Sequence, residues 1–346
     1  MDGVWRMPCW SAAEEGVMRN SITRPNIESV IAAIGLVVAV VLPSMAADNL
    51  TFVTDFGFNG RHAYYFLALD KGYYKEEGLD VTIVRGQGSS DAVKQVAAGT
   101  AQIGFGDASA VILARGNDNT DVKLISVIYA KPPQAIYVLK SSGINKPKDL
   151  EGRKVADTAF SSIPKLFPAY AKAAGIDASK VTWLVSTSDA LPGLLSLGRV
   201  DGIGQYTVGE PLLKKAAGAQ ELNELAYVDA GLDFYGAGLL ADKKLIATNP
   251  DLVRRFVKAT LRGLEDAIAH PQEAAAAMHK AHREVDLDIA AAETEKVGKL
   301  AKLDGKPMGS VDPARMQKTI DFIAGAYQMR NPVKLDEVFA AGFAPK

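Results

Sequence analysis

The sequence predicts an α/β protein built from two lobes, each a mostly parallel sheet flanked by helices. Three observations lead to this fold class. Short apolar stretches that suit strands alternate with stretches of helical periodicity, most regularly over residues 51–116, and such alternation is typical of parallel sheets covered by helices. The chain has 346 residues, enough for two compact lobes. A Pro-Pro pair, Pro132-Pro133, separates two apolar strands at a suitable crossing point between the lobes.

The first lobe is expected to begin with three strand–helix units. Strands are predicted at 51–54, 81–84 and 103–105. The first helix is indicated by residues that recur at i, i+3, i+4 and i+7, namely His62, Tyr65, Phe66 and Leu69. Gly72 stands where a glycine commonly ends a helix.

Two further helices of this lobe are predicted from their end signals. One covers 92–98, with Ser89, Ser90 or Asp91 as its N-cap and Gly99 at its end. The other covers 108–115, with Asp107 as its N-cap and Gly116 at its end. Helix N-termini and strand ends gather along one edge of such a sheet, so we expect the ligand there.

The second lobe is expected to occupy 135–234, between a strand at 121–129 and a return crossing at 234–236. The first lobe then consists of 47–134 and 235–346. Strands are predicted at 134–139, 153–156, 181–185, 201–204, 226–229 and 236–241. The predicted helices follow Ser161 or Ser162 as far as Gly175, cover 190–197 after the caps Ser188 and Asp189, and cover 208–217 before Gly218.

A weak internal repeat links the two lobes. Residues 88–93 resemble residues 186–191, and each stretch is followed by a short apolar helix, a glycine and a glycine-flanked strand. Either the two lobes are built alike, or the same capping signals occur twice by chance.

The residues after 249 are expected to form helices that pack on the first lobe. Asn249-Pro250 begins one helix, with Val253, Phe256, Val257 and Thr260 on one face. Another begins at His270-Pro271. A third begins at Asp312-Pro313, with Met316, Ile320 and Ile323 on one face, and residues 331–339 close the chain.

Residues 1–46 read as an N-terminal extension followed by a secretory signal peptide. The apolar run 30–42 follows Arg19 and Arg24, and small residues at Ser44 and Ala46 suit a cut after Ala46. The run is shorter than the ~20 residues that a membrane-spanning helix needs, which makes an anchor the less favoured alternative. Met18 is a plausible true start, because Glu14 and Glu15 do not suit a signal peptide.

Charge and cysteine content narrow the function. The formal net charge is −1, so no basic surface indicates nucleic-acid binding. Cys9 is the only cysteine and precedes the predicted cut, so no disulfide or thiol chemistry is expected after it. These features fit an exported protein of the periplasm, and we expect a monomer.

Two connected stretches resemble a known family. The run LALDKGYYKEEGLDV, followed by GQGSSDAVKQVAAGTAQIGFGDAS, is similar to solute-binding proteins of ATP-driven (ABC) uptake systems for nitrate, sulfonates, taurine and thiamine-pyrimidine precursors. The similarity continues through KDLEGRKVA, LSLGRVDGIG and NPDLVRRFVKATLRGL and so covers about 50–343. The resemblance implies a two-lobed type II periplasmic-binding-protein fold, with a ligand held between the lobes.

No catalytic constellation is found in the sequence. There is no nucleophile elbow, phosphate-binding loop or dinucleotide fingerprint. His270, His279 and His282 lack neighbours at metal-ligand spacing, and we expect them to be solvated. No cofactor or metal is expected. Fungal pyrimidine synthases that resemble the family use a cysteine-rich segment, which this chain lacks after residue 9, so the enzymatic reading is kept as the alternative.

The candidate ligand residues of the first lobe lie at strand ends and helix starts. Aromatic rings can stack on a planar ligand, and amide or hydroxyl groups can orient it. Ser89 and Ser90 would either cap a helix or present it to an anion. His62 is favoured as a core or capping residue, and Asp107 as a cap. The candidates are Phe56, Phe58, Asn59, His62, Ser89, Ser90, Asp107 and Tyr129.

The candidates of the second lobe and its return crossing are Ser161, Ser162, Asp189, Tyr206, Glu210 and Tyr235. In thiamine-pyrimidine binders that resemble this chain, a carboxylate near this point meets the ring amine, which implies Glu210 as a polar anchor. Glu210 also suits the first turn of a helix. Tyr206 stands where those binders often have a tryptophan-rich segment.

We therefore expect a solute-binding component of an ABC importer that closes around its ligand and docks on a permease coupled to an ATPase. The candidate set holds three carboxylates and only Arg61 as a nearby cation. This balance favours a planar, amine-bearing ligand over a sulfonate, and Glu210→Ala is expected to weaken its binding.

Overall fold

The computed structural model describes residues 47–302 and 305–344, all of which belong to one compact unit. The predicted extension and signal peptide lie outside the described residues. Within the described ranges, no helix combines the length and apolar character needed to cross a membrane.

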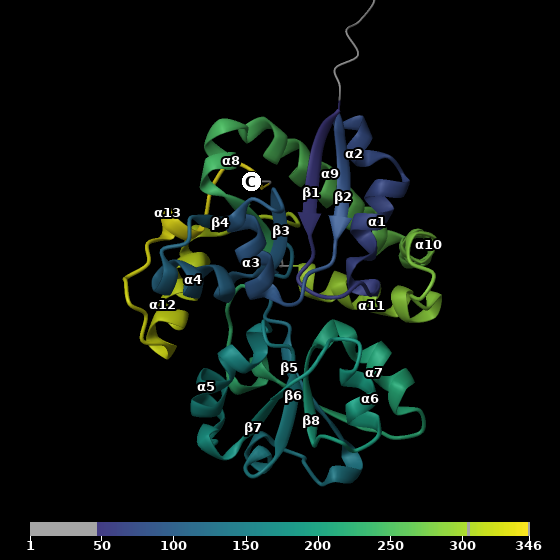
Figure 1. The fold of residues 1–346 in the computed structure, drawn as a ribbon, viewed down its shortest axis with the longest axis vertical. Coiled ribbons are helices and arrows are strands. Elements are labelled where there is room, and N and C mark those ends of the chain that lie inside the picture. Colours follow the sequence, from purple (N-terminus) through teal and green to yellow (C-terminus); the bar gives the residue numbers. More distant parts are fainter. Residues whose placement is uncertain (1–46, 303–304, 345–346) are drawn as a thin grey trace, which may run out of the picture. The chain divides into compact units, whose positions relative to one another are not determined.

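Two five-stranded sheets confirm the predicted α/β class (Figure 1). The first has the order β2-β1-β3-β10-β4, and the second has the order β7-β6-β8-β5-β9. The strands of the first are β1 (Asp48–Val53), β2 (Leu79–Val84), β3 (Ile103–Asp107), β4 (Val122–Val127) and β10 (Ala237–Asp242). Those of the second are β5 (Gln134–Leu139), β6 (Lys154–Asp157), β7 (Thr182–Val185), β8 (Gly202–Tyr206) and β9 (Leu222–Ala226).

The two sheets have the same internal plan. β1 is parallel to β2 and β3, as β6 is to β7 and β8. β10 is antiparallel to β3 and β4, as β5 is to β8 and β9. The first repeated stretch begins α3 (Ser89–Ala98), which connects β2 to β3, and the second leads into α6 (Leu191–Ser196), which connects β7 to β8. The sequence repeat therefore falls at matching places in the two sheets.

The chain passes from the first sheet to the second between β4 and β5, at Pro132-Pro133. It returns between β9 and β10. We refer to β1–β4, β10 and their helices as the first lobe, and to β5–β9 and their helices as the second lobe.

The helices of the first lobe differ from the prediction mainly at their ends. They are the 3-10 turn η1 (Gly60–His62), α1 (Ala63–Asp70), α2 (Tyr73–Glu76), α3 (Ser89–Ala98) and α4 (Ala108–Asp118). Gly72, at φ 76°, confirms the predicted break. The predicted caps of α3 were wrong, because Gly88 holds the N-cap position and Ser89 already lies in the helix. Gly116 lies inside α4 against Met329, and Asn119, at φ 52°, ends that helix instead.

In the second lobe the helices are α5 (Ser162–Ala174), α6 (Leu191–Ser196) and α7 (Glu210–Ala217), with the short turns η2 (Lys140–Ser142), η3 (Pro147–Leu150), η4 (Ala178–Lys180), η5 (Thr207–Gly209) and η6 (Tyr227–Ala230). Ser161 caps α5 by accepting from the backbone N–H of Ile163, as predicted. Ser188 and Asp189 do not cap α6, whose N-cap position is held by Ala190. The predicted strand at 226–229 was wrong, because pairing with β5 ends at Ala226 and η6 follows.

The C-terminal helices are α8 (Lys243–Thr248), α9 (Pro250–Ala269), α10 (Pro271–Ala281), α11 (Leu287–Ala301), α12 (Pro313–Ala326) and α13 (Leu335–Val338). The predicted faces of α9 and α12 are buried. Asn249 and Asp312 cap these two helices through their side chains. α8 and α11 were not predicted.

Helix α11 also corrects the expectation that the tail packs on the first lobe alone. Lys296 in α11 pairs with Glu210 of α7 at 2.5 Å. Asp286, the N-cap residue of α11, pairs with Lys215 of α7 at 2.5 Å. On its other side, α11 lies so close to η1 that a Cβ at Gly60 would be 2.3 Å from Ala290 Cα. α11 therefore contacts both lobes.

Two apolar clusters form the core. The larger includes residues of both lobes, whereas the smaller belongs to one side of the second sheet. Alternate residues of β5 separate them, because successive side chains of a strand point to opposite faces. Ile136 and Val138 join the larger cluster, and Ala135 and Tyr137 join the smaller.

Candidate functional site

A cluster of buried polar side chains lies where the carboxyl ends of the two sheets meet. It is assembled from the loop after β1, the end of β3, the start of α3, the end of β6, the start of α5 and the end of β8. This is the edge at which α/β sheets commonly bind ligands. The small cavity inside it has a volume of about 10 Å³, which is room for about one water molecule. Its lining includes Asp55, Phe56, Arg61, Ser89, Asp157, Ser161, Ser162, Gln205 and Tyr206.

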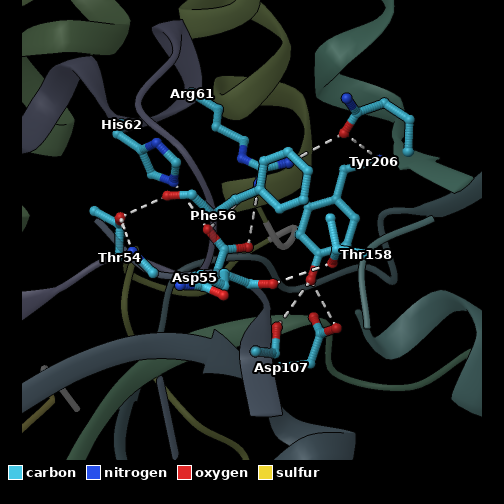
Figure 2. A network of polar contacts seen from close by, with 12 residues as sticks. Thr54, Asp55, Phe56, Arg61, His62, Asp107, Thr158 and Tyr206 are labelled. Carbon is cyan, nitrogen blue, oxygen red and sulfur yellow. Dashed lines mark hydrogen bonds and ion pairs between the residues drawn. The ribbon is translucent and has the colours of Figure 1, made fainter. Parts of the chain in front are cut away.

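Arg61 is the central residue of this cluster and is only 1% exposed. Its guanidinium carbon lies 4.8 Å from the ring centroid of Phe56 and 4.7 Å from that of Tyr206. Nη1 donates to Gln205 Oε1 at 3.3 Å, and Nη2 lies 3.5 Å from both carboxylate oxygens of Asp55. Figure 2 shows these groups together. The cation thus contacts Phe56 and Asp55 in the first lobe and Gln205 and Tyr206 in the second.

Asp55 and His62 form a second part of the cluster. His62 Nε2 lies 2.8 Å from Asp55 Oδ1, and both side chains are buried (Figure 2). Burial lowers the pKa of His62, so the neutral imidazole donates its N–H to Asp55. Burial alone would raise the pKa of Asp55, but the charge of Arg61 and the bond from His62 together hold it below its usual value. Asp55 therefore balances the charge of Arg61.

A hydrogen bond between Tyr206 and Asp107 joins the two lobes. The Tyr206 hydroxyl donates to Asp107 Oδ2 at 2.7 Å, and Gln134 Nε2 donates to the same oxygen at 3.0 Å. Ser89 Oγ lies 3.2 Å from the Tyr206 hydroxyl and donates to it, because the hydroxyl hydrogen is already used. Asp107 occupies the N-cap position of α4, yet its side chain makes no capping bond. The predicted role of Asp107 as a cap was wrong, because its carboxylate bonds to the second lobe instead.

Three buried carboxyl groups have raised pKa values. Burial raises the pKa of Asp107 to about 6, of Asp157 to about 7 and of Glu293 to about 7. Each keeps one oxygen without a protein partner in the described part of the chain. Buried polar atoms normally have partners. The free oxygen of Asp157 therefore makes this residue, which lines the inner cavity, a suitable acceptor for a ligand N–H or O–H.

A wider groove lies beside the inner cavity and shares Phe56 and Gln205 with it. Its volume is about 450 Å³, within the range of small-molecule sites. Phe58, Asn59 and Glu293 line it from the first lobe and α11, and Asp189 lines it from the second lobe. The groove is the natural approach from solvent to the buried cluster.

The structure brings most of the predicted site residues to these two cavities. Phe56, Ser89, Ser161, Ser162 and Tyr206 line the inner cavity, and Phe56, Phe58, Asn59 and Asp189 line the groove. His62, Asp107 and Tyr129 are buried among the same side chains. The Tyr129 ring centroid is 6.5 Å from that of Tyr206, and its hydroxyl has no partner among the described residues.

Three predicted residues lie elsewhere. Ser90 accepts a hydrogen bond from Lys165 Nζ at 2.6 Å and lines a different groove, beside α3 and α4. Tyr235 accepts at its hydroxyl from the Asp312 backbone N–H at 2.9 Å. The Glu210 carboxylate pairs with Lys214 at 2.8 Å and with Lys296 at 2.5 Å, and it lines neither the inner cavity nor the wider groove.

The histidines of the tail are not all solvated. His270 is exposed, as expected, whereas His282 packs on the rings of Phe58 and Phe66 at 4.2 and 5.0 Å. The expectation for His282 was therefore wrong, because the chain turns after α10 and places this ring against the loop after β1. Across 47–302 and 305–344, no three His, Cys, Asp or Glu side chains are grouped to hold a metal ion.

Several members of the cluster were not among the candidates chosen from the sequence: Asp55, Gln134, Asp157, Gln205 and Glu293. Arg61 was named there only as a cation near the site. Asp157 and Gln205 lie at or next to a strand end, which is the one local signal they carry. Glu293 is buried in α11, and its Oε2 accepts from the Arg61 backbone N–H at 3.3 Å. No local signal marks Glu293, because this contact joins residues far apart in the chain.

Comparisons with known proteins agree with this architecture. The alkanesulfonate-binding protein SsuA from Xanthomonas axonopodis pv. citri, solved with MOPS bound, superposes with a TM-score of 0.66 at 14% identity, covering 86% of this chain and 99% of that one. The formylaminopyrimidine-binding protein of Halalkalibacterium halodurans is 26% identical over 306 residues, covering 86% of this chain and 91% of that protein.

A fungal enzyme is similar over a shorter stretch. The 4-amino-5-hydroxymethyl-2-methylpyrimidine phosphate synthase of Aspergillus parasiticus is 26% identical over 242 residues, which is 66% of this chain and 70% of the enzyme. A family model described as "NMT1/THI5 like" matches residues 59–274, more than half of the chain. The two lobes, the shared sheet plan and this match together show that the chain belongs to the NMT1/THI5-like family.

Proposed function

We propose that the protein is the extracytoplasmic solute-binding component of an ABC importer and captures a small organic solute between its lobes. The buried polar cluster around Arg61 carries this proposal. Both lobes contribute side chains to it, and several of its buried acceptor atoms have no hydrogen-bond partner among the described residues. The binding proteins among the relatives support the same reading.

The mechanism is closure of the lobes on the solute. A solute that contacts both lobes binds the closed form more tightly than the open form and shifts the population toward it. Several hydrogen bonds across the cleft are already in place in this structure, among them Tyr206 to Asp107, Gln134 to Asp107, Thr158 Oγ1 to Gln87 O and the Ser90 N–H to Phe160 O. The closed form would then dock on a membrane permease driven by an ATPase.

The chemistry of the cluster favours a planar solute with N–H donors. Asp157 Oδ2, Asp107 Oδ1, Glu293 Oε1 and Gln134 Oε1 are buried acceptors without partners among the described residues. Aromatic rings at Phe56 and Tyr206 suit stacking on a planar group. A thiamine-pyrimidine precursor has both a planar ring and N–H donors, and the relative named for formylaminopyrimidine binding supports this choice. A taurine-like or alkanesulfonate solute is the second choice, supported by the fold neighbour named for alkanesulfonates.

Pyrimidine synthesis is the alternative function, because several relatives carry the name of a pyrimidine phosphate synthase. Within the cluster, the hydrogen-bonded pair of His62 and Asp55 is the arrangement most similar to an acid–base pair of an enzyme. We favour binding, since the chain has one cysteine, Cys9, and the fungal enzymes resembled in the sequence use several. Mass spectrometry of the small molecules formed by the purified protein would detect a pyrimidine phosphate if the enzymatic reading holds.

The test of the binding function is thermal unfolding of residues 47–346 with a ligand panel. The panel contains hydroxymethylpyrimidine, its formylamino precursor, taurine, alkanesulfonates, nitrate and riboflavin. A ligand present at 100 times its dissociation constant stabilises the folded state by about 2.7 kcal/mol, which is a visible shift in melting temperature. A shift with one class identifies the solute, and no shift with any member would contradict the proposed solute classes.

Export belongs to the same proposal. The periplasmic relatives suggest a location outside the cytoplasm, and the predicted cut after Ala46 would release a chain that starts at Ala47. Mass spectrometry of the protein recovered from the periplasm gives the mature N-terminus directly. A chain that keeps residues 30–46 would contradict the predicted cleavage.

A further inference from the structure

Arg61 occupies the place in the cluster that best suits a planar ligand. Its guanidinium is planar, delocalised and rich in N–H donors. It rests on the rings of Phe56 and Tyr206 and points its donors at Gln205 and Asp55 (Figure 2). We call the space flanked by the two rings the aromatic slot.

The aromatic slot has no room for a solute while Arg61 fills it. The cavity that remains holds about 10 Å³, or about one water molecule. A solute that stacks on both rings must therefore take the space of the guanidinium. Arg61 is also bound by both lobes at once, which is the behaviour that the proposed function assigns to a solute.

The neighbouring groove offers Arg61 a second position. Gly60, beside Arg61, lines this groove, and so does Glu293. Glu293 Oε1 is buried and has no partner within the described ranges, whereas Glu293 Oε2 accepts from the Arg61 backbone N–H. A carboxylate with an oxygen that has no partner among the described residues thus lies next to the Arg61 backbone, in the wider groove, and can receive the displaced guanidinium.

We propose that Arg61 is a built-in surrogate for the solute. Its guanidinium fills the aromatic slot and holds the lobes together when no solute is bound, and it moves toward Glu293 when a planar nitrogen heterocycle takes its place. The displacement of Arg61 by a planar nitrogen heterocycle rests on the proposed function. The surrogate lowers the apparent affinity for the solute, because the slot is vacant in only a fraction of the molecules.

The first experiment does not depend on the natural solute. Arg61→Ala empties the slot, so free guanidinium ion should bind there and raise the melting temperature of this variant. The measurement compares guanidinium chloride, well below denaturing concentrations, with equal concentrations of sodium chloride. We expect a rise for Arg61→Ala and none for the natural sequence. Equal responses of the two proteins to guanidinium would overturn the surrogate role.

Arg262 provides a matched control. Its guanidinium carbon lies 3.7 Å from the ring centroid of Tyr73, but the side chain is 52% exposed and lines neither the inner cavity nor the wider groove. Arg262→Ala should gain nothing from guanidinium. If it responds as Arg61→Ala does, the effect is generic stacking on exposed rings, and the inference fails.

The second experiment uses hydroxymethylpyrimidine as the probe, in calorimetric titrations of the natural sequence, Arg61→Ala and Arg61→Lys. Removing an internal competitor should tighten binding by about tenfold or more in both variants. Arg61→Lys keeps the positive charge beside Asp55 but lacks the planar group. If Arg61→Ala does not fold, the titration of Arg61→Lys tests the inference in its place. Weaker binding by the variants would overturn the inference, because Arg61 would then contact the solute directly.

The two experiments separate this inference from the proposed function. If no panel member binds any of the proteins but guanidinium rescues Arg61→Ala, the surrogate role in the ligand-free protein stands and the proposed solute is wrong. If the probe binds the natural sequence and both Arg61 variants bind it less well, the solute-binding function stands and the surrogate role is wrong.

Discussion

The hydroxyl of Tyr206 donates to Asp107 Oδ2 at 2.7 Å, and these two residues occupy matching positions in the two sheets. Ile103 pairs with Phe52 of β1, as Gly202 pairs with Val155 of β6, and Asp107 and Tyr206 each lie four residues further on. The lobes thus meet through the corresponding ends of β3 and β8.

Tyr206→Phe should favour the open form of the ligand-free protein. The variant keeps the ring but loses a hydrogen bond to a carboxyl group, a type of bond that contributes about 1.5–3 kcal/mol. Small-angle X-ray scattering should then show a larger radius of gyration. Tyr170→Phe is the control, because the Tyr170 hydroxyl has no partner among the described residues. Identical scattering from the two variants would show that this bond does not hold the lobes together.

Gly88→Ala should prevent full closure. A Cβ at Gly88 would lie 2.3 Å from the backbone of Phe160, across the cleft, and the residue has a φ of 143°. The variant should bind the solute more weakly and scatter as an open form. Gly99→Ala is a suitable control, since that glycine also has a positive φ, 74°, but has no atom within 4 Å of the added Cβ. The control should lose about 1–2 kcal/mol of stability and still close.

Stability should fall as the pH rises from about 4 to about 7. The pKa values of Asp107, Asp157 and Glu293 in the folded protein, about 6, 7 and 7, exceed their ordinary values of 3.8, 3.8 and 4.5. The folded state therefore holds more protons than the unfolded state in this window, and its free energy of unfolding decreases with pH. Urea unfolding at several pH values measures the slope.

Asp157→Asn should flatten this slope, because the amide does not titrate. Asp80→Asn, at an exposed position of β2, is the control and should keep the natural slope. Asp55 acts in the opposite sense, since its pKa is lowered by Arg61 and His62 against the effect of burial. The effect of Asp55 is confined to pH values near and below its ordinary pKa of 3.8, whereas His62, whose pKa burial lowers from 6.5, stabilises the folded state as the pH rises toward 7. A free energy of unfolding that rises between pH 5 and 7 would therefore mean that His62 outweighs the three raised carboxyl groups.

Glu210→Gln should leave the affinity for the solute within about twofold of the natural value. The sequence predicts that Glu210→Ala loses affinity for the solute, but in the structure the carboxylate pairs with Lys214 and Lys296 outside the two site cavities. Half-exposed ion pairs of this kind contribute about 0–1 kcal/mol. Calorimetric titration with hydroxymethylpyrimidine measures the affinity of the variant. A large loss of affinity would show that Glu210 is the polar anchor after all.

Local patterns predicted most of the fold. The alternation of strands and helices, Gly72 and Gly175 as helix ends, and the caps Ser161, Asn249 and Asp312 depend on neighbours within a few residues, so the sequence displays them. The prediction of a strand at 226–229 was wrong, because the end of β9 is set by its pairing with β5, which is remote in sequence. α11 was missed, although its buried face holds Ala290, Thr294 and Val297 at helical spacing, because its apolar residues are small.

The site was predictable only in outline. Strand ends and helix starts pointed to Phe56, Ser89, Ser161 and Tyr206, which do line the inner cavity. Ser90 and Glu210 were chosen on the same grounds and face other surroundings, because one-residue shifts along a helix change the direction of a side chain. The place of Arg61 depends on Gln205 and Glu293, at 144 and 232 residues' separation, and no local pattern encodes such contacts.

The matched strand ends have one more consequence. Two identical lobes would form a cleft with twofold symmetry, which presents the same groups to either end of a guest molecule. Here one lobe offers an acid at Asp107 and the other a phenol at Tyr206, with Gln134 beside it. The two halves of the cleft are therefore chemically unequal, and the solute that we propose would meet different groups from the two lobes.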